Sequence, residues 1–203
     1  NQSQGVETVA VGHYAGNISQ GDKSVALGQE SGRFQQGEKA VALGQQAGFL
    51  QQGGKAVAVG EEAGMSQQGD YSVAVGQEAG YDQQGDKAVA IGSDAGYTQQ
   101  GDKSIAIGEN AGYSQQGDKS IAIGENAGFT KQGDKSIAIG MLAGQTSQND
   151  KTIILNATGE TLDSSGDSRF YVKPMRGDNP SASGDFKPLY YDFNTGEIIY
   201  DNR

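Results

Sequence analysis

The chain has 203 residues, of which 33 are glycine and 34% are hydrophobic, and it carries a formal net charge of −10 and no cysteine. A hydrophobic fraction this far below the about 45–50% of ordinary domains leaves little material for a thick core, and the lack of cysteine excludes a disulfide framework. The negative charge opposes binding to nucleic-acid phosphates and no apolar run approaches the ~20 residues that span a bilayer, so we expect neither a nucleic-acid partner nor membrane insertion.

A 16-residue repeat organises the chain from its N-terminus to about residue 155. One unit, residues 101–116, reads GDKSIAIGENAGYSQQ. Nine units follow one another without insertion, and a tenth begins at Asn149, which takes a glycine position. Three glycines in each unit would cost a helix roughly 1 kcal/mol apiece relative to alanine. The repeat therefore predicts an all-β fold, a parallel β-roll or solenoid in which each unit forms one coil.

Each unit contains one clear strand, in which aliphatic residues alternate with alanine. Ile105 and Ile107 share one face of this strand, and Ala106 takes the other. We predict that the aliphatic positions form the core stripes of the roll. From the fifth unit onward these stripes are Val73, Val75, Val89, Ile91, Ile105, Ile107, Ile121, Ile123, Ile137 and Ile139. Residues 111–114 are predicted to be a second, weaker extended segment, and the sequence Gln-Gln-Gly-Asp is predicted to make the return turn.

A single coil buries little apolar surface, and this predicts association between chains. Burial of a few aliphatic side chains is small relative to the entropy lost in ordering sixteen residues. The alanines at the centre of each strand, from Ala10 to Ala138, offer a flat strip that another chain could approach closely. We therefore predict a homotrimer of parallel rolls in contact along this strip. A monomeric solenoid with the alanine strip in solvent is the alternative.

The last part of the chain breaks the period and holds all three prolines. We assign residues 1–155 to the repeat shaft or head and residues 156–203 to a small β neck or tip. Residues 170–174 are predicted to form a strand. Residues 189–200 are predicted to form a hairpin, because an Asn-Thr-Gly turn separates two runs of β-forming residues.

One column of the repeat is aromatic in the later units. Its members are Tyr81, Tyr97, Tyr113 and Phe129, preceded by Phe49 and Met65. These side chains are expected to pack inside the roll or at the trimer interface. The alternative is an exposed tyrosine platform that stacks against the sugars of a cell surface.

Two polar columns accompany the turns. An acidic column runs from Asp22 to Asp150 beside a column of lysines, and it is interpreted as a charge ladder on a solvated turn, with Ca²⁺ binding as the alternative. Paired glutamines, from residues 35–36 to 115–116, are predicted to stack as hydrogen-bonded amide ladders with a structural role.

Catalysis has little support in the sequence. His13 is the only histidine and has no cysteine partner. Residues 107–112 match the hexapeptide of left-handed β-helix acyltransferases, but the hexapeptide occurs once in each 16-residue unit, whereas those enzymes repeat it three times per coil. The tripeptide formed by residues 176–178, Arg-Gly-Asp, is interpreted as a chance match to the integrin-binding signal. We expect no enzyme activity, no cofactor and no metal.

The sequence SVAVG or SIAIG, followed by two residues and Ala-Gly, resembles the head repeat of trimeric autotransporter adhesins of the YadA type over residues 5 to about 155. The resemblance implies a left-handed parallel β-roll, three associated chains and binding to host surfaces. The usual adhesin unit is shorter, so the turn and the second strand are expected to differ here.

The C-terminal string FYVKPMRG…LYYDFNTGEIIYDN resembles the segment before the intramolecular chaperone of phage and large-virus fibre proteins. Such chaperones trimerise the fibre and then cut themselves off. The resemblance implies that Arg203 is the residue left at a self-cleavage site.

These features together predict a structural and adhesive segment of a trimeric viral or phage-like fibre, on an extracellular or virion surface. Its expected partners are two further copies of itself and a glycan or protein receptor on a host cell. The alternative is the head domain of a bacterial trimeric adhesin on the bacterial cell surface.

Overall fold

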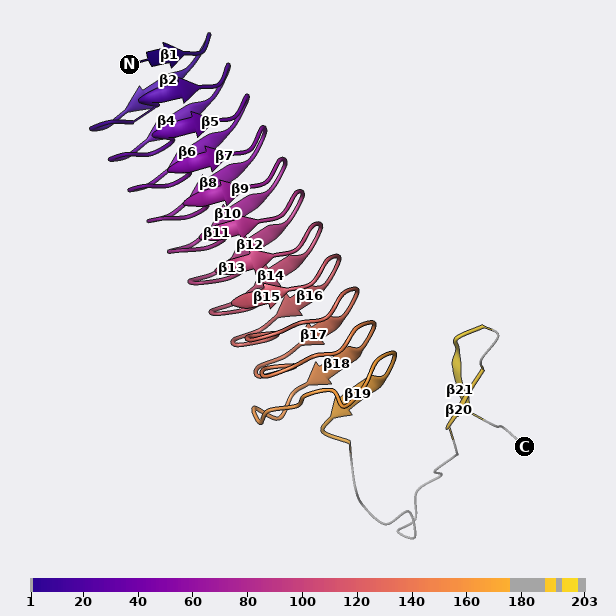
Figure 1. Cartoon of the computed structure of the whole chain (residues 1–203). Helices are drawn as coiled ribbons and strands as arrows, with labels where there is room; N and C mark the ends of the chain where they lie inside the picture. The colour runs from indigo at the N-terminus through magenta and orange to yellow at the C-terminus, as the bar shows by residue number, and fades with distance from the viewer. Residues whose placement is uncertain (1, 176–188, 193–194, 201–203) are drawn as a thin grey trace.

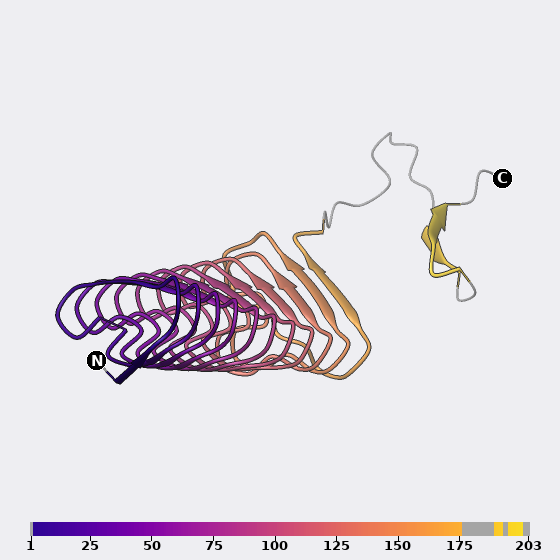
Figure 2. The same cartoon turned by 90° about the horizontal axis from the view of Figure 1, so that it is seen from above.

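The computed structural model describes residues 2–175, 189–192 and 195–200. These residues form an all-β chain, without a helix, that winds into a parallel β-solenoid of about 10 coils (Figure 1). Figure 2 shows the coils as a row of loops of similar outline, each displaced from the one before it. The 16-residue repeat and the parallel solenoid expected from it are confirmed.

The longer of the two solenoid sheets has 11 strands and contains the aliphatic segments. Its strands are β2 (Val9–Val11), β4 (Val25–Leu27), β6 (Val41–Leu43), β8 (Val57–Val59), β10 (Val73–Val75), β12 (Val89–Ile91), β14 (Ile105–Ile107), β16 (Ile121–Ile123), β17 (Ile137–Ile139), β18 (Ile153–Asn156) and β19 (Phe170–Lys173). Neighbours pair in parallel, and Ile105 lies opposite Ile121. Positions sixteen apart therefore lie over one another.

The second sheet has 8 strands and runs along the other side of the solenoid. Its strands are β1 (Gln2–Gln4), β3 (Ile18–Gln20), β5 (Phe34–Gln36), β7 (Leu50–Gln52), β9 (Ser66–Gln68), β11 (Asp82–Gln84), β13 (Thr98–Gln100) and β15 (Ser114–Gln116). The prediction of this segment at residues 111–114 was wrong, and so was the assignment of the glutamine pair to a turn. Asn110 and Gly112 have φ values of 55° and 56°, so the chain is still turning there and becomes extended only at Ser114.

The interior of the solenoid is lined by alanine. From Ala26 to Ala138 the central alanine of each strand is fully buried. From Ala42 onward it joins the alanine of the following turn, such as Ala111, in one continuous cluster. Buried Ser104 completes the lining, and its hydroxyl donates to the Gly101 carbonyl at 2.7 Å.

The predicted assignment of strand faces is therefore reversed in the single chain. The expected core stripes point outward and remain at least partly exposed: Val73, Val75, Val89, Ile91, Ile105, Ile107, Ile121, Ile123, Ile137 and Ile139. The alanine strip faces inward and cannot contact another chain. The reason is space, because the buried glutamine side chains of the shorter sheet already cross the interior, as where Gln116 Nε2 donates to the Ile105 carbonyl at 2.8 Å.

The C-terminal end of the solenoid departs from the repeat. Ile154 replaces the buried alanine, and Leu162 and Tyr171 pack against the core cluster. The predicted strand at residues 170–174 is confirmed as β19, which pairs in parallel with β18. The main sheet thus extends beyond residue 155, where the repeat ends.

The predicted C-terminal hairpin is confirmed by β20 (Leu189–Tyr191) and β21 (Ile198–Tyr200), which pair antiparallel. Part of its turn, residues 193–194, lies outside the described residues. The tripeptide at residues 176–178 and the expected cleavage end at Arg203 also lie outside them.

Substituting a stacked glycine should disrupt the coil spacing. Gly108 has a φ of +126°, and a Cβ atom there would lie 2.8 Å from the carbonyl carbon and oxygen of Gly124 in the next coil. We expect Gly108→Ala to lower the free energy of unfolding by about 2 kcal/mol or more. Urea unfolding followed by circular dichroism measures this change.

Gly54→Ala is the matched control. A Cβ atom at Gly54 would come no closer than 3.7 Å to its neighbours, and the backbone there does not need glycine. This variant should be neutral, or more stable by up to about 1 kcal/mol through a smaller entropy loss on folding. Equal destabilisation by both substitutions would contradict the role assigned to close glycine stacking.

Candidate interaction surfaces of the solenoid

A ladder of glutamine amides runs through the interior, opposite the alanine strip. Gln84 is 2% exposed. Its Nε2 donates to the Val73 carbonyl at 2.9 Å and to Gln100 Oε1 at 3.0 Å, while its Oε1 accepts from Gln68 Nε2 at 3.1 Å. The predicted amide ladder is confirmed for the second glutamine of each pair, whereas the first, such as Gln83, is exposed with a φ of 58°.

The ladder also explains one glycine column. A Cβ atom at Gly112 would lie 2.8 Å from Gln116 Oε1. Glycine at this position therefore leaves room for the amide group to cross the interior. The ladder is interrupted twice, because the buried Oε1 atoms of Gln36 and Gln116 have no hydrogen-bond partner among the described residues.

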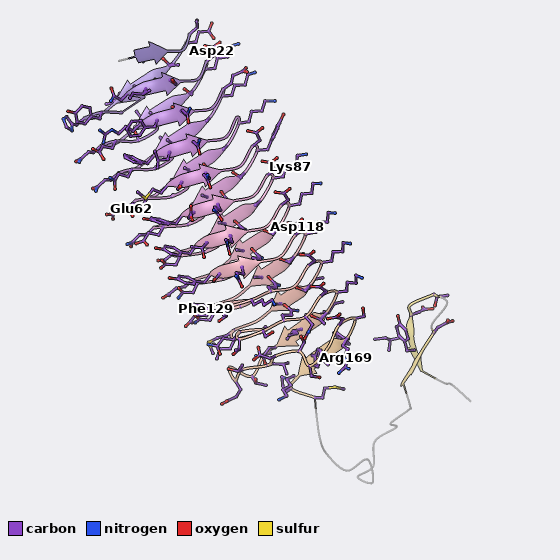
Figure 3. All side chains as sticks on the ribbon, in the orientation of Figure 1. Asp22, Glu62, Lys87, Asp118, Phe129 and Arg169 are labelled. Atoms are coloured by element: carbon purple, nitrogen blue, oxygen red, sulfur yellow. The ribbon has the colours of Figure 1, made fainter. Side chains whose placement is uncertain are left out.

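The acidic column forms a backbone-capping ladder that the sequence did not suggest. Asp118 Oδ1 accepts a hydrogen bond from the backbone N–H of Asp102 at 2.9 Å, and Asp102 does the same for Asp86 at 2.9 Å. Each aspartate of the column thus satisfies an amide of the preceding coil, in the exposed turn that carries Asp22, Lys87 and Asp118 (Figure 3).

The adjacent lysines do not pair with these aspartates in the described part of the chain. The ion pairs recorded there join Lys23 to Glu7, Arg33 to Glu30, and Lys39 to Glu38. The hydrogen bond and positive charge of Lys39 hold the pKa of Glu38 below its usual value. Within the described residues no group of three or more histidine, cysteine, aspartate or glutamate side chains is arranged to hold a metal ion.

An unbroken apolar surface runs along the outside of the longer sheet. Each strand from β2 to β18 places two aliphatic side chains outward, and every one of them is at least partly exposed. Ile91 and Ile139, for example, are each 39% exposed. No charged side chain interrupts these two columns. This surface is here called the aliphatic face.

The aromatic column forms a stack on the outside of the turn that follows each aliphatic strand. The ring centroids of Tyr81 and Tyr97 are 4.8 Å apart with planes at 12°, and those of Tyr97 and Tyr113 are 4.8 Å apart at 4°. Phe129 continues the stack at 4.9 Å from Tyr113. All four residues are half-buried. The expected burial inside the roll was wrong, and the ring faces needed for a sugar platform are covered by one another.

The electrostatic setting of this stack is acidic. Burial raises the pKa of Tyr81 and Tyr97, and nearby carboxylates reinforce the shift: Glu62 and Glu78 act on Tyr81, and Glu78 acts on Tyr97. Glu62 and Phe129 lie on the same edge of the solenoid (Figure 3). The ionised form of Tyr81 and Tyr97 is therefore less favourable than that of an ordinary phenol, which is itself neutral at physiological pH.

A second aromatic cluster in the early coils was missed from the sequence. The guanidinium carbon of Arg33 lies 4.9 Å from the ring centre of Tyr14 and 4.8 Å from that of Phe34, and its Nη1 pairs with Glu30 at 2.9 Å. Arg33 occupies the position that is aromatic in the later coils. Because a guanidinium group packs well on aromatic rings, its place in this column could have predicted the cluster from the sequence.

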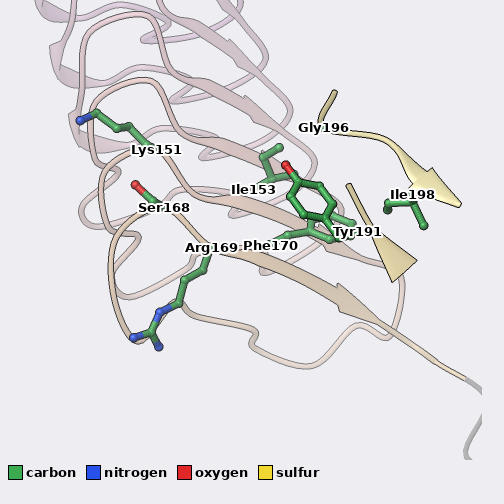
Figure 4. A pocket seen from close by; sticks show the side chains of 8 residues that line it. All are labelled: Lys151, Ile153, Ser168, Arg169, Phe170, Tyr191, Gly196 and Ile198. Atoms are coloured by element: carbon green, nitrogen blue, oxygen red, sulfur yellow. The ribbon is translucent and has the colours of Figure 1, made fainter. Parts of the chain in front are cut away.

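A pocket of about 590 Å³ lies between the last strands of the long sheet and the hairpin (Figure 4). The Tyr191 ring lies beside Ile153 and Phe170, whereas the charged ends of Lys151 and Arg169 point away. The lining thus brings together apolar groups and no catalytic set. His13 is exposed at the far end of the solenoid, with its ring centre 4.0 Å from that of Tyr14.

In the described parts of the chain, no helix has the length and hydropathy needed to cross a membrane. Compared with known proteins, the chain matches no family model, and a search of curated protein sequences finds no significant match.

Removing one interior amide should destabilise the solenoid. Gln84→Ala leaves Gln68 and Gln100 without their partner in a buried ladder, and we expect a loss of about 1–3 kcal/mol in the free energy of unfolding. The neighbouring variant Gln83→Ala, on the exposed face, should change it by less than about 0.5 kcal/mol. Chemical denaturation of both variants makes the comparison, and similar losses would show that the buried ladder has no special role.

Proposed function

We propose that the chain is a structural and adhesive segment of a trimeric fibre, of viral or phage-like type, that attaches to a host cell surface. The observation that carries the assembly part of this proposal is the aliphatic face. It repeats with the coil spacing, holds only valine, isoleucine and leucine from β2 to β18, and is uncovered in the single chain. An apolar surface of this extent and regularity favours association.

A second copy of the same chain is the partner that fits this face. Identical coils carry identical columns at the same spacing, so parallel copies in register can pack their side chains over the whole length. Association through the aliphatic face replaces association through the alanine strip, which lies in the interior. Three copies arranged around this face would leave the charged turns and the aromatic stack in solvent.

The attachment part of the proposal is supported by the resemblance of the repeat to adhesin heads and by the elongated form of the solenoid. A rod built from stacked coils can present the same surface group many times, and three chains multiply that number. Repetition increases the strength of attachment through avidity, even when each individual contact is weak.

The alternative, a head domain of a bacterial trimeric adhesin, draws on the same repeat. The two proposals differ in what the encoding gene specifies after Arg203. A coiled-coil stalk and a membrane anchor would favour the bacterial adhesin, whereas an intramolecular chaperone would favour the fibre.

Charges placed on the aliphatic face should separate the chains. We expect the wild-type protein to have three times the 21.1 kDa mass of one chain in light scattering, and the double variant Ile91→Lys, Ile139→Lys to have the mass of one chain. Both isoleucines point outward, so circular dichroism should show that the variant keeps its β-structure.

The double variant Gln83→Lys, Gln115→Lys is the control, because it adds the same charge to the exposed side of the shorter sheet. It should remain trimeric. A wild-type protein of single-chain mass would refute assembly through the aliphatic face, and so would a control that dissociates as readily as the isoleucine variant.

Attachment should depend on assembly. Fluorescently labelled wild-type protein should bind host cells or an array of surface glycans, and the single-chain isoleucine variant should bind about 100-fold more weakly through the loss of avidity. The glutamine variant should bind as the wild type does. Failure of the assembled wild-type protein to bind any tested surface would contradict the adhesive role while leaving the assembly proposal intact.

A further inference from the structure

The tyrosine stack places three phenols in successive coils at close range. Tyr81, Tyr97 and Tyr113 each lie 4.8 Å from the next ring, and the ring planes are nearly parallel. In such a stack the carbon ortho to one hydroxyl lies close to the equivalent carbon of the next ring. The side chains are half-buried, so they pack against the coil while their outer edges remain open to solvent.

This geometry suits the coupling of phenoxyl radicals. Two tyrosyl radicals join by a bond between their ortho carbons when the rings meet, and that meeting usually limits the reaction. Here the backbone ladder holds the rings together, which raises the effective concentration of one phenol near the next. Coupling requires rotation about the side-chain bonds to bring the two carbons into contact, and these half-buried side chains are not enclosed on every side.

The surroundings also supply proton acceptors. Glu62 and Glu78 lie near the Tyr81 phenol, and Glu78 and Asp94 lie near that of Tyr97. An ordinary phenol is already neutral at physiological pH, and burial and these carboxylates raise the pKa of both phenols further. Each ring must therefore lose a proton together with its electron. These carboxylates and solvent water are the acceptors available for that proton.

We propose that Tyr81, Tyr97 and Tyr113 form a modification site at which hydrogen peroxide, acting through a haem peroxidase, joins neighbouring coils by dityrosine bonds. The reaction balances as follows. Each of two phenols loses one electron and one proton, and the two electrons and two protons convert one peroxide molecule to two water molecules. The ortho carbons then form the new bond, and the hydrogen on each ortho carbon moves to the oxygen to restore the phenol.

Two other described tyrosines of the solenoid provide a contrast within the same molecule. Tyr14 and Tyr71 are more accessible, at 49% and 52% exposed. However, the Tyr14 ring contacts the His13 ring and the Arg33 guanidinium, and the Tyr71 ring contacts the Lys55 ammonium, so neither is recorded in contact with another tyrosine among the described residues. If solvent exposure determined which tyrosines couple, Tyr14 and Tyr71 would react first. If the distance between rings determines it, the stacked tyrosines react first.

Each bond would connect residues sixteen apart and would fasten one coil to the next. Tyr97 occupies the centre, so it takes part in both of the neighbouring pairs. The modification would oppose the separation of these coils at a position where their attachment otherwise depends on hydrogen bonds and ring stacking. This inference is independent of the adhesive role, because it concerns contacts within one chain.

The test is oxidation of the purified folded protein with hydrogen peroxide and a haem peroxidase. Cleavage after lysine separates the sites, because Lys87 and Lys103 lie between the three tyrosines. We expect dityrosine fluorescence and cross-linked peptides that join Tyr97 to Tyr81 or to Tyr113, with the loss of two hydrogen atoms per bond. A mixture of unlabelled and ¹⁵N-labelled chains should give no cross-linked peptide pair of mixed label.

Tyr97→Phe keeps the ring stack but removes the central phenol, and it should reduce the yield of dityrosine from the stack at least about tenfold. Tyr71→Phe, the control, should leave that yield unchanged. The proposal fails if Tyr14 or Tyr71 dominates the products, if mixed-label peptides dominate, if Tyr97→Phe has no effect, or if urea-unfolded protein couples the same pairs equally well.

Discussion

Parallel pairing between each coil and the coil sixteen residues away is the constraint on which the rest of the molecule depends. Neighbouring parallel strands lie about 4.8 Å apart, so every residue must tolerate its equivalent at that distance above and below. Glycine is required where backbone meets backbone, as at Gly108 over Gly124. Other columns hold groups that gain from stacking: amides bond to amides, aromatic rings cover aromatic rings, and aspartates accept hydrogen bonds from the preceding coil.

The same constraint determines what lies inside and what lies outside. Turns this short bring the two sheets close together, so the interior accepts alanine, serine and one glutamine per coil. The larger aliphatic side chains are left on the outer surface, where they form two continuous columns. A single chain therefore has an interior with little apolar volume and an exterior with an uncovered apolar face. Both features favour a structure completed by association, and both follow from coil dimensions rather than from composition alone.

The sequence was sufficient to predict the period, the strand at Ile105–Ile107, its register and the C-terminal hairpin, because each rests on a local pattern. Alternation showed that Ile105 and Ala106 face opposite ways, but it could not show which one faces inward, since that depends on the distance between the sheets. The position of the second strand was predicted wrongly because non-glycine residues such as Asn110 and Gln115 have left-handed φ values, and the residue types alone do not reveal this. The capping by Asp118 depends on a neighbouring coil and has no local signal.

Stacking equivalent residues is unfavourable where the column carries like charges. The pKa of Glu62 is raised, first by burial and then by the charges of Glu78 and Glu61. A raised carboxyl pKa means that the folded chain holds this proton more tightly than the unfolded chain does, so the charged group opposes folding at neutral pH. The penalty decreases as the pH falls below the folded pKa and is gone below the unfolded pKa. In the later coils this column changes to Asn110 and Asn126, which keep the left-handed turn without the charge. The repeat therefore keeps the left-handed turn at this position in the later coils but does not keep the charge.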